Sequence, residues 1–379
     1  MHGSATKMIT VLISLLFLTA CSTLPINGTL PDGLTAEKIV SVDRGAAFAL
    51  SPDGNVVAIG SEGPKLLHIP SREDVPLGTK IPLKLAWSPL GNSLAAIYAT
   101  DDGSSIVVYD QHGIAIAESP VNALLTSIGW LSEDELVAGG IRLKSYKFGS
   151  NYQSLFFRWM PGRNMLTEHS LRDTTLQPST LASWKHLLQR GPLLDLSPQS
   201  ATLLYLHPVD PPVFTPYYKL IMKDLASGSE LEIASVGFNS DGGRFSADGE
   251  RVLYSDGNGT TLLYNPWTEE TLRTTNTSGH NLALSPEGEN WIADGALFRK
   301  DSAVLPLAKG AEAAFSPDGS RIMLRVEGAM YLLSGLKRAE GTLFVAAVAE
   351  KVAKLRSMRI QGLVTASEYK ESLQKVAAP

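Results

Sequence analysis

Short apolar runs alternate with polar turn phrases along most of this chain of 379 residues. An apolar run, the phrase Ser-Pro-x-Gly or a degenerate form of it, and a second apolar run recur seven times. The serines of these phrases are Ser51, Ser88, Ser132, Ser197, Ser246, Ser285 and Ser316. Proline presets φ at the first central position of a turn and glycine accepts a positive φ, so each phrase predicts a tight turn between two strands.

A further pair of strands follows several of the turns, as in residues 93–110 and 251–264. Three or four short strands in a period of about 40–45 residues are typical of a propeller blade. The apolar faces of a blade are covered only by its neighbours, so the ring has to close. We therefore predict an all-β fold, a β-propeller over residues 39–336. Seven phrases favour seven blades, and the degenerate third and fourth phrases leave six or eight open.

The strand–Ser-Pro-Asp-Gly–strand phrase resembles the WD-repeat-like β-propeller repeat. That repeat occurs in the periplasmic propeller of the bacterial Tol system and in many envelope lipoproteins. Gly279-His280 before a strand, and Tyr109-Asp110 at the end of one, are similar to the Gly-His and Trp-Asp positions of WD repeats. Most of the other phrases lack both pairs, so the resemblance is to the looser group.

Two connections are longer than a blade needs. Ser132 and Ser197 are 65 residues apart, and the stretch Pro178–Gln189 between them is a candidate short helix. The segment Pro208–Tyr218 is rich in proline and aromatic residues, which favours extended polyproline geometry. Insertions in propellers fall on one rim, often the binding rim. The alternative interpretation is that both are plain strand connections with packed aromatic side chains.

The N-terminus has the pattern of an export signal. Lys7 precedes the apolar run Met8–Leu18, which is shorter than the ~20 residues that span a bilayer but suits a signal peptide. The sequence Leu18-Thr19-Ala20-Cys21 resembles the lipobox of bacterial lipoproteins. The resemblance implies that residues 1–20 are a signal peptide, that the chain is cleaved between Ala20 and Cys21, and that Cys21 carries the lipid. The alternative is an ordinary signal peptide with an incidental cysteine.

Several consequences follow for location. Residues 21–38 would form a lipidated tether, because two prolines and two glycines interrupt any regular pattern between Ser22 and Leu34. A residue other than Asp after the lipidated cysteine, here Ser22, is similar to the pattern of lipoproteins sorted to the outer membrane. We therefore expect a cell-envelope protein held by lipid, in the outer membrane and facing the periplasm.

The C-terminal residues 337–379 follow another pattern. Val345, Val348, Val352, Leu355 and Met358 recur at spacings of three and four, which predicts one face of a helix. Gly362 stands at a C-cap position, and Thr365 with Glu368 forms a capping box before a second helix.

This tail resembles the SHOCT short C-terminal domain. The matching residues are Leu355, Arg356, Met358, Arg359, Gly362, Leu363, Val364, Thr365, Glu368 and Tyr369. The resemblance implies a helical hairpin that docks or self-associates through residues 340–379. Its apolar face is too small to fold alone, so it should pack on the propeller, on a second copy or on a partner. Its net charge of +4 suits anionic headgroups, or it is a solvated helix face.

Composition excludes some classes of site and partner. The net charge of −5 offers no general basic surface for nucleic acid. A single cysteine leaves no intramolecular disulfide and no metal site built on cysteine pairs.

No catalytic motif stands out. There is no Gly-x-Ser-x-Gly elbow and no glycine-rich phosphate loop, and the seven histidines lack metal-ligand spacing. His280 is interpreted as structural, and Asp101–Gly103 and Asp256–Gly259 as hairpin turns rather than calcium loops. We therefore predict no catalytic, cofactor-binding or metal-binding residue.

The function predicted from the sequence is a non-enzymatic, lipid-anchored binding or scaffolding module with protein or glycan partners. The alternative is an envelope enzyme, a hydrolase or lyase, whose active site is assembled at the propeller's central funnel from different blades. Acids and histidines with perturbed pKa values at the funnel would favour the enzyme. A lining of small and apolar residues would favour the scaffold.

Overall fold

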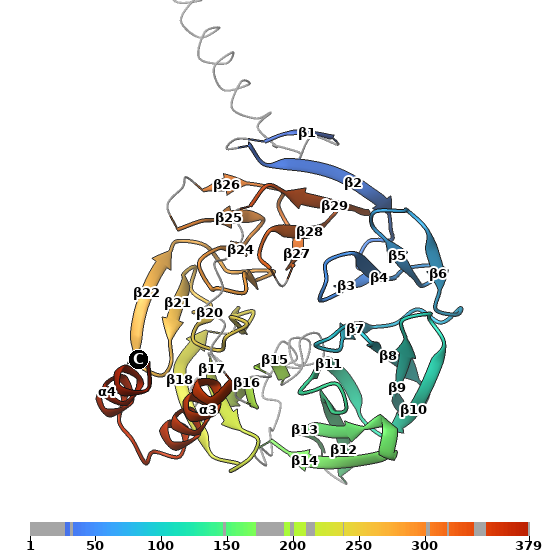
Figure 1. Cartoon of the computed structure of the whole chain (residues 1–379). Coiled ribbons are helices and arrows are strands. Elements are labelled where there is room, and N and C mark those ends of the chain that lie inside the picture. The colour runs from blue at the N-terminus through green and yellow to red at the C-terminus, as the bar shows by residue number, and fades with distance from the viewer. Residues whose placement is uncertain are drawn as a thin grey trace, which may run out of the picture.

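Seven antiparallel sheets stand side by side around a common axis in the computed structural model of the chain, which confirms the seven-bladed propeller (Figure 1). The structure describes residues 27–30, 33–146, 149–171, 193–197, 201–209, 217–237, 239–300, 304–316, 318–336 and 346–377. The predictions for Ala20, Cys21 and the stretch Pro178–Gln189 lie outside these residues, as does most of Pro208–Tyr218.

The first six blades each use four consecutive strands, with the first nearest the axis. Blades 1 to 3 are formed by β3 (Ala47–Leu50), β4 (Val56–Gly60), β5 (Lys65–His68) and β6 (Asp74–Pro76); by β7 (Lys84–Trp87), β8 (Ser93–Thr100), β9 (Gly103–Asp110) and β10 (Ala115–Val121); and by β11 (Leu124–Trp130), β12 (Leu136–Tyr146), β13 (Gly149–Met160) and β14 (Met165–Ser170), with the 3-10 turn η2 (Pro161–Arg163) before β14. Blades 4 to 6 are formed by β15 (Leu193–Ser197), β16 (Thr202–Val209), β17 (Tyr217–Asp224) and β18 (Glu230–Gly237); by β19 (Gly243–Phe245), β20 (Val252–Ser255), β21 (Thr261–Asn265) and β22 (Glu270–Thr275); and by β23 (Ala283–Leu284), β24 (Trp291–Ala293), β25 (Ala296–Phe298) and β26 (Leu305–Pro306).

The seventh blade closes the ring with the N-terminal part of the chain. Its inner strands are β27 (Glu312–Phe315), β28 (Arg321–Val326) and β29 (Ala329–Ser334), and its outer strands are β2 (Thr35–Ser41) and β1 (Asn27–Thr29). β2 pairs antiparallel with β29, with Ala36 opposite Leu333. The segment that the sequence assigns to the tether thus contains β1 and the start of β2. Its prolines and glycines suggested a linker, whereas the free edge of β29 gives these residues a partner that local patterning does not reveal.

All seven turn phrases join the first and second strands of a blade, which confirms their interpretation as hairpin turns. In the first phrase, Ser51 Oγ donates to Asp53 Oδ1 at 2.5 Å and accepts from the Val56 backbone N–H at 2.9 Å. Gly54 has φ of 69°, the left-handed conformation that glycine adopts without strain. The turns of Ser246 and Ser316 repeat these bonds. The serine therefore closes the turn from inside and leaves no unpaired hydroxyl.

Hydrogen bonds on the face of the ring that carries the turn phrases also hold neighbouring blades together. Trp87 Nε1 donates to Ala49 O of the preceding blade at 3.1 Å, and Trp130 Nε1 donates to Ala86 O at 3.0 Å. Ala247 N donates to Pro286 O at 2.9 Å. Buried apolar clusters fill the spaces between blades, as between blades 2 and 3 around Trp159. Each blade is therefore stabilised by its neighbours rather than by a core of its own.

The C-terminal hairpin consists of α3 (Ala346–Ile360) and α4 (Ala366–Ala377), as predicted. Gly362 follows α3 with φ of 73°, and Leu363 N donates to Met358 O at 2.9 Å. The capping box of α4 is present: Glu368 N donates to Thr365 Oγ1 at 3.2 Å, and Thr365 N donates to Glu368 Oε2 at 2.7 Å. The hydrogen bonds that the backbone N–H and the hydroxyl of Thr365 donate to the Glu368 carboxylate lower the pKa of that carboxylate. In the described part of the chain, no helix is long and apolar enough to cross a bilayer.

Candidate functional site

The hairpin lies over blades 4 and 5, on the face of the ring that carries the seven turn phrases (Figure 1). Ile360 of α3 and Tyr369 of α4 are buried in one apolar cluster with Trp267, which lies in the β21–β22 turn. The rings of Trp267 and Tyr369 stack with centroids 6.1 Å apart. Of the three places that the sequence left open for the hairpin, the propeller is the one observed.

Arg356 of α3 fixes the hairpin to blade 5. Its guanidinium lies 5.2 Å from the centre of the Trp267 ring, donates from Nη1 to Asp248 O at 2.8 Å, and pairs with the carboxylate of Glu250. Trp267 Nε1 donates to Gly249 O at 2.7 Å, which holds the ring under the guanidinium. The side chain of Arg356 is only 4% exposed, so the cation–π contact and the ion pair are largely shielded from solvent.

Three further polar contacts surround this anchor. Arg359 pairs with Glu269, Ser357 donates to Asp224 at the end of β17, and Lys370 of α4 pairs with Glu270 at 2.7 Å. Glu269 lies in the β21–β22 turn, and Asp224 and Glu270 lie at the ends of strands in blades 4 and 5. Burial next to this cluster raises the pKa of the Tyr369 hydroxyl to about 12.

The stripe of α3 that faces the ring differs from the one that the sequence predicts. Val352, Arg356, Arg359 and Ile360 are buried, whereas Met358 lines the outer groove and Leu355 contacts both the core and the groove. The spacing of apolar residues predicted the helix correctly. It did not reveal the docking face, because two of the four residues buried there, Arg356 and Arg359, are charged. The matching partner, Trp267, gave no signal in the sequence beyond its position in a turn.

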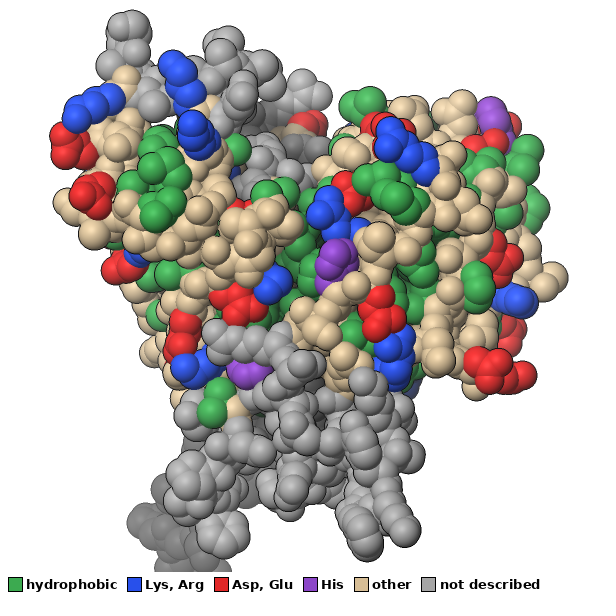
Figure 2. Space-filling model, turned by 90° about the horizontal axis from the view of Figure 1, so that it is seen from below, with side chains coloured by type: hydrophobic (Ala, Val, Ile, Leu, Met, Phe, Trp, Pro, Cys, Tyr) green, Lys and Arg blue, Asp and Glu red, His purple; other side chains and the backbone are tan. Residues whose placement is uncertain are grey.

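The outer side of the hairpin holds a groove of about 380 Å³ between α3 and α4. Its lining residues are Lys351, Lys354, Leu355, Met358, Ser372 and Lys375. Figure 2 shows apolar side chains framed by Lys and Arg at its upper left, where the hairpin lies. Lys375 pairs with Glu371 on the same helix, while Lys351 and Lys354 have no ion pair with any described residue.

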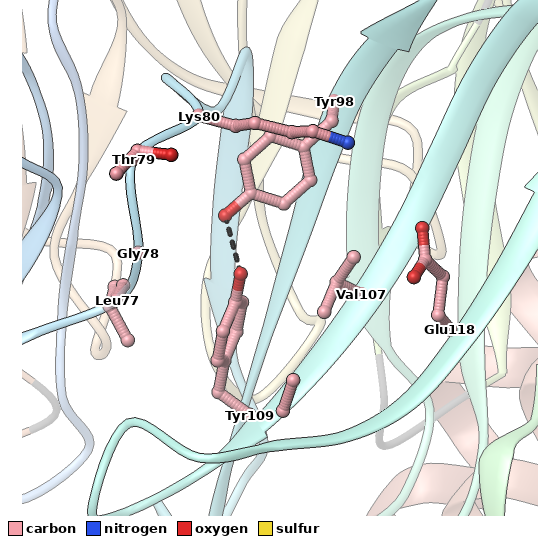
Figure 3. Close-up of a pocket in the computed structure, with 9 residues that line it drawn as sticks. Leu77, Gly78, Thr79, Lys80, Tyr98, Val107, Tyr109 and Glu118 are labelled. Carbon is pink, nitrogen blue, oxygen red and sulfur yellow. Dashed lines mark hydrogen bonds between the residues drawn. The ribbon is translucent and has the colours of Figure 1, made fainter.

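A second pocket, of about 210 Å³, lies between blades 1 and 2 (Figure 3). The hydroxyls of Tyr98 and Tyr109 are 2.7 Å apart there, and Glu118 accepts from Ser105 Oγ at 2.7 Å. Burial and the bond to Tyr109 raise the pKa of Tyr98. Lys80 from the β6–β7 connection borders the pocket (Figure 3). The small volume of the pocket and the hydrogen-bonded tyrosine pair fit space left between diverging blades.

Charged side chains from three blades influence one another across the axis of the ring. Burial and Arg244 of blade 5 lower the pKa of Lys84 of blade 2, and Glu312 of blade 7 acts in the opposite direction. Glu312 itself pairs with Arg325.

Asp195 of β15 also belongs to this group near the axis. Burial raises its pKa against the effect of Arg244, and its carboxylate accepts from Phe245 N at 2.5 Å. The axis therefore carries both cations and acids.

His280 forms part of the joint between neighbouring blades. Its Nδ1 lies 2.9 Å from Asp241 Oδ2, and its backbone N–H donates to Asp294 Oδ1 at 3.0 Å. Asp256, at the start of the suspected calcium loop, accepts from Asn258 N at 2.7 Å and Thr260 N at 2.9 Å, as a hairpin turn requires. The described residues contain no group of three or more His, Cys, Asp or Glu side chains placed to hold a metal ion.

Comparison with known proteins supports the fold. Among the 1049 matching chains of solved structures is the β-propeller domain of Cps50 (Swd1) from Myceliophteria thermophila, with a TM-score of 0.55 and 12% sequence identity. The match covers 79% of this chain and all of that domain. The chain is similar to a WD40-like propeller in fold. No protein-family model matches the sequence, and no curated protein matches it.

Proposed function

We propose that this chain is a lipid-anchored, non-enzymatic binding module of the bacterial cell envelope, placed in the outer membrane and facing the periplasm. The resemblance of Leu18–Cys21 to a lipobox supports the anchor. The observation that carries the binding role is the docked hairpin. It is fixed to blade 5 through Arg356 and Trp267 and to blade 4 through Ser357. It presents a groove in which Lys351 and Lys354 have no ion pair with any described residue.

The geometry supports binding better than catalysis. A binding module needs a rigid surface, and the closed ring with its docked hairpin supplies one. The groups along the axis are engaged in structure: Asp195 accepts from a backbone N–H, and Arg325 pairs with Glu312. A hydrolase or lyase would need a nucleophile or base aimed at a substrate site, whereas Asp195, Glu312 and Arg325 bond to the backbone or to each other. The lowered pKa of Lys84 and the raised pKa of Asp195 are the features on which the enzyme alternative would rest.

The anchor is tested by cell fractionation with Cys21→Ser. The wild-type chain should incorporate labelled palmitate and sediment with outer membranes, whereas the variant should take up no label and retain its signal segment. Equal labelling of the two chains would remove the lipid from the proposal. Separation of inner from outer membranes tests the assignment suggested by Ser22.

The binding role is tested by photo-crosslinking in intact cells. A crosslinker is placed at Ser372 in the groove, at Gln111 on a distant turn, and at other exposed sites around the ring. A binding module should give discrete adducts from a limited set of these sites. A chain that gives no adduct from any of them, while remaining folded and anchored, is not a binding module.

A further inference from the structure

The groove between α3 and α4 has the chemistry of a docking site. We infer that it receives an acidic, amphipathic helical segment of a partner protein, which inserts an apolar side chain between lysines and places carboxylates beside them. This inference rests on the proposed binding function and names the surface and the partner's chemistry.

Charge is distributed unevenly in this molecule. Residues 337–379 contain eight Lys/Arg and four Asp/Glu, a net charge of +4, whereas the preceding 336 residues carry −9. The hairpin neutralises its own arginines against the ring, through Glu250 and Glu269. Lys370 also pairs with the ring, through Glu270, and Lys375 pairs with Glu371. Among the described cations of the hairpin, Lys351 and Lys354 of the groove are the two without an ion pair to a described residue, so the groove lining is locally basic. An acidic partner complements this surface, and the rest of the chain repels it.

The groove also offers apolar contact. Leu355 and Met358 form its floor, and Met side chains adapt to varied partners. Leu363, in the turn between the helices, adds a further apolar side chain that is 65% exposed on the hairpin. Lysines flanking an apolar groove between two helices match the helix-in-groove mode of recognition, where anchors at i and i+4 enter the groove and charges set orientation.

A second copy fits this groove poorly. In a symmetrical dimer the same patch meets itself, so Lys351 and Lys354 would approach the same lysines of the other copy, and Glu371 at the edge of the groove is already paired with Lys375. Like charges at a shared interface oppose that pairing.

The anchoring bilayer is also a poor occupant. Five residues separate Cys21 from Asn27, so a lipid on Cys21 would lie within about 20 Å of β1. β1 lies at the top of the ring in Figure 1, and α3 and α4 lie at its lower left, two to three blades away. A membrane that holds the β1 edge is therefore not beside the groove.

The direct test measures binding of a labelled synthetic peptide to the full-length chain with Cys21→Ser, which lacks the lipid site. The peptide is a helix former with leucines at i and i+4 flanked by glutamates, and a matched peptide has lysine in place of each glutamate. The acidic peptide should bind at least tenfold more tightly than the basic one at low salt, and less tightly as salt rises.

Variants locate the site. Lys351→Gln, Lys354→Gln and Lys375→Gln together should weaken binding of the acidic peptide about tenfold, while the helices should stay docked because these three side chains are exposed. The control combines Lys38→Gln, Lys80→Gln and Lys309→Gln, three exposed lysines outside the hairpin, and should change affinity less than about twofold. Equal affinities for the two triple variants would overturn the inference.

Two other results would also overturn it. If phosphatidylglycerol–phosphatidylethanolamine vesicles bind the unlipidated chain and lose binding with the groove triple variant, the occupant is a bilayer. If the chain dimerises and the groove variant is monomeric, the occupant is a second copy. Crosslinking separates this inference from the proposed function. A partner captured from Gln111 but never from Ser372 leaves the binding module standing and removes the groove.

Discussion

The two sides of the C-terminal hairpin use basic residues in opposite ways. Toward the ring, Arg356 and Arg359 are buried and paired with Glu250 and Glu269. Toward solvent, the groove is bordered by Lys351, Lys354 and Lys375. Lys375 pairs with Glu371, and the other two have no ion pair with any described residue. A guanidinium is planar, weakly hydrated and able to stack on an aromatic ring, which suits a buried contact, whereas an ammonium is strongly hydrated and suits an exposed rim. The inner side therefore fixes the hairpin, and the outer side remains available.

The strongest way to break this contrast is to remove the aromatic platform. Trp267→Ala should destabilise the protein by about 4 kcal/mol, because it deletes a fully buried indole that Arg356, Tyr369 and Gly249 all contact. Urea unfolding measures the total, and hydrogen exchange over 346–377 shows whether the helices open first. In a chain truncated after residue 336, the same substitution should cost clearly less. An equal cost in both chains means that Trp267 serves blade 5 alone.

The next largest effect should come from Arg356. Arg356→Met keeps much of the side-chain volume but leaves Glu250 without its partner, so we expect a loss of about 3 kcal/mol. Adding Glu250→Gln to this variant should restore part of the lost stability, since no unpaired carboxylate then remains at position 250.

The matched substitution on the outer side is Lys354→Met, for which a change within about 0.5 kcal/mol is expected in the same urea titration. A large loss from Lys354→Met would contradict the division of the hairpin into a fixing side and a free side.

Alkaline pH should loosen the inner side through Tyr369. Its hydroxyl has a pKa of about 12 in the folded chain and of 10.0 ordinarily, so the folded state holds this proton more tightly. The resulting stability is complete below pH 10 and is lost as the pH rises from 10 to 12, by roughly 3 kcal/mol in all. Tyr369→Phe should flatten this part of the stability–pH curve relative to wild type. Parallel curves for the two proteins would show that Tyr369 does not titrate at the interface.

The same contrast explains what could be predicted from sequence. The turn phrases and the helix caps were predictable because their bonds join residues within about one turn of each other, as Ser51 with Asp53 and Thr365 with Glu368. The pairing of Ala36 with Leu333 and the contact of Arg356 with Trp267 join distant parts of the chain. Buried arginines on a helix look like solvated charges until their partners are known. The docking side was therefore missed, and the lysines of the outer side were noticed only as net charge.

The smallest effect separates helix strength from docking. Thr365→Ala removes the side chain that caps α4 and should cost about 1 kcal/mol, because Glu368 N then loses its acceptor. Ser367→Ala, two residues later and exposed, is the control and should change stability by less than about 0.3 kcal/mol. The loss from Thr365→Ala should appear in hydrogen exchange over 366–377 and leave Arg356 docked, as shown by unchanged exchange over 351–360. If exchange rises equally in both helices, α3 depends on α4 for its position, and the anchor at Arg356 and Trp267 does not hold the hairpin by itself.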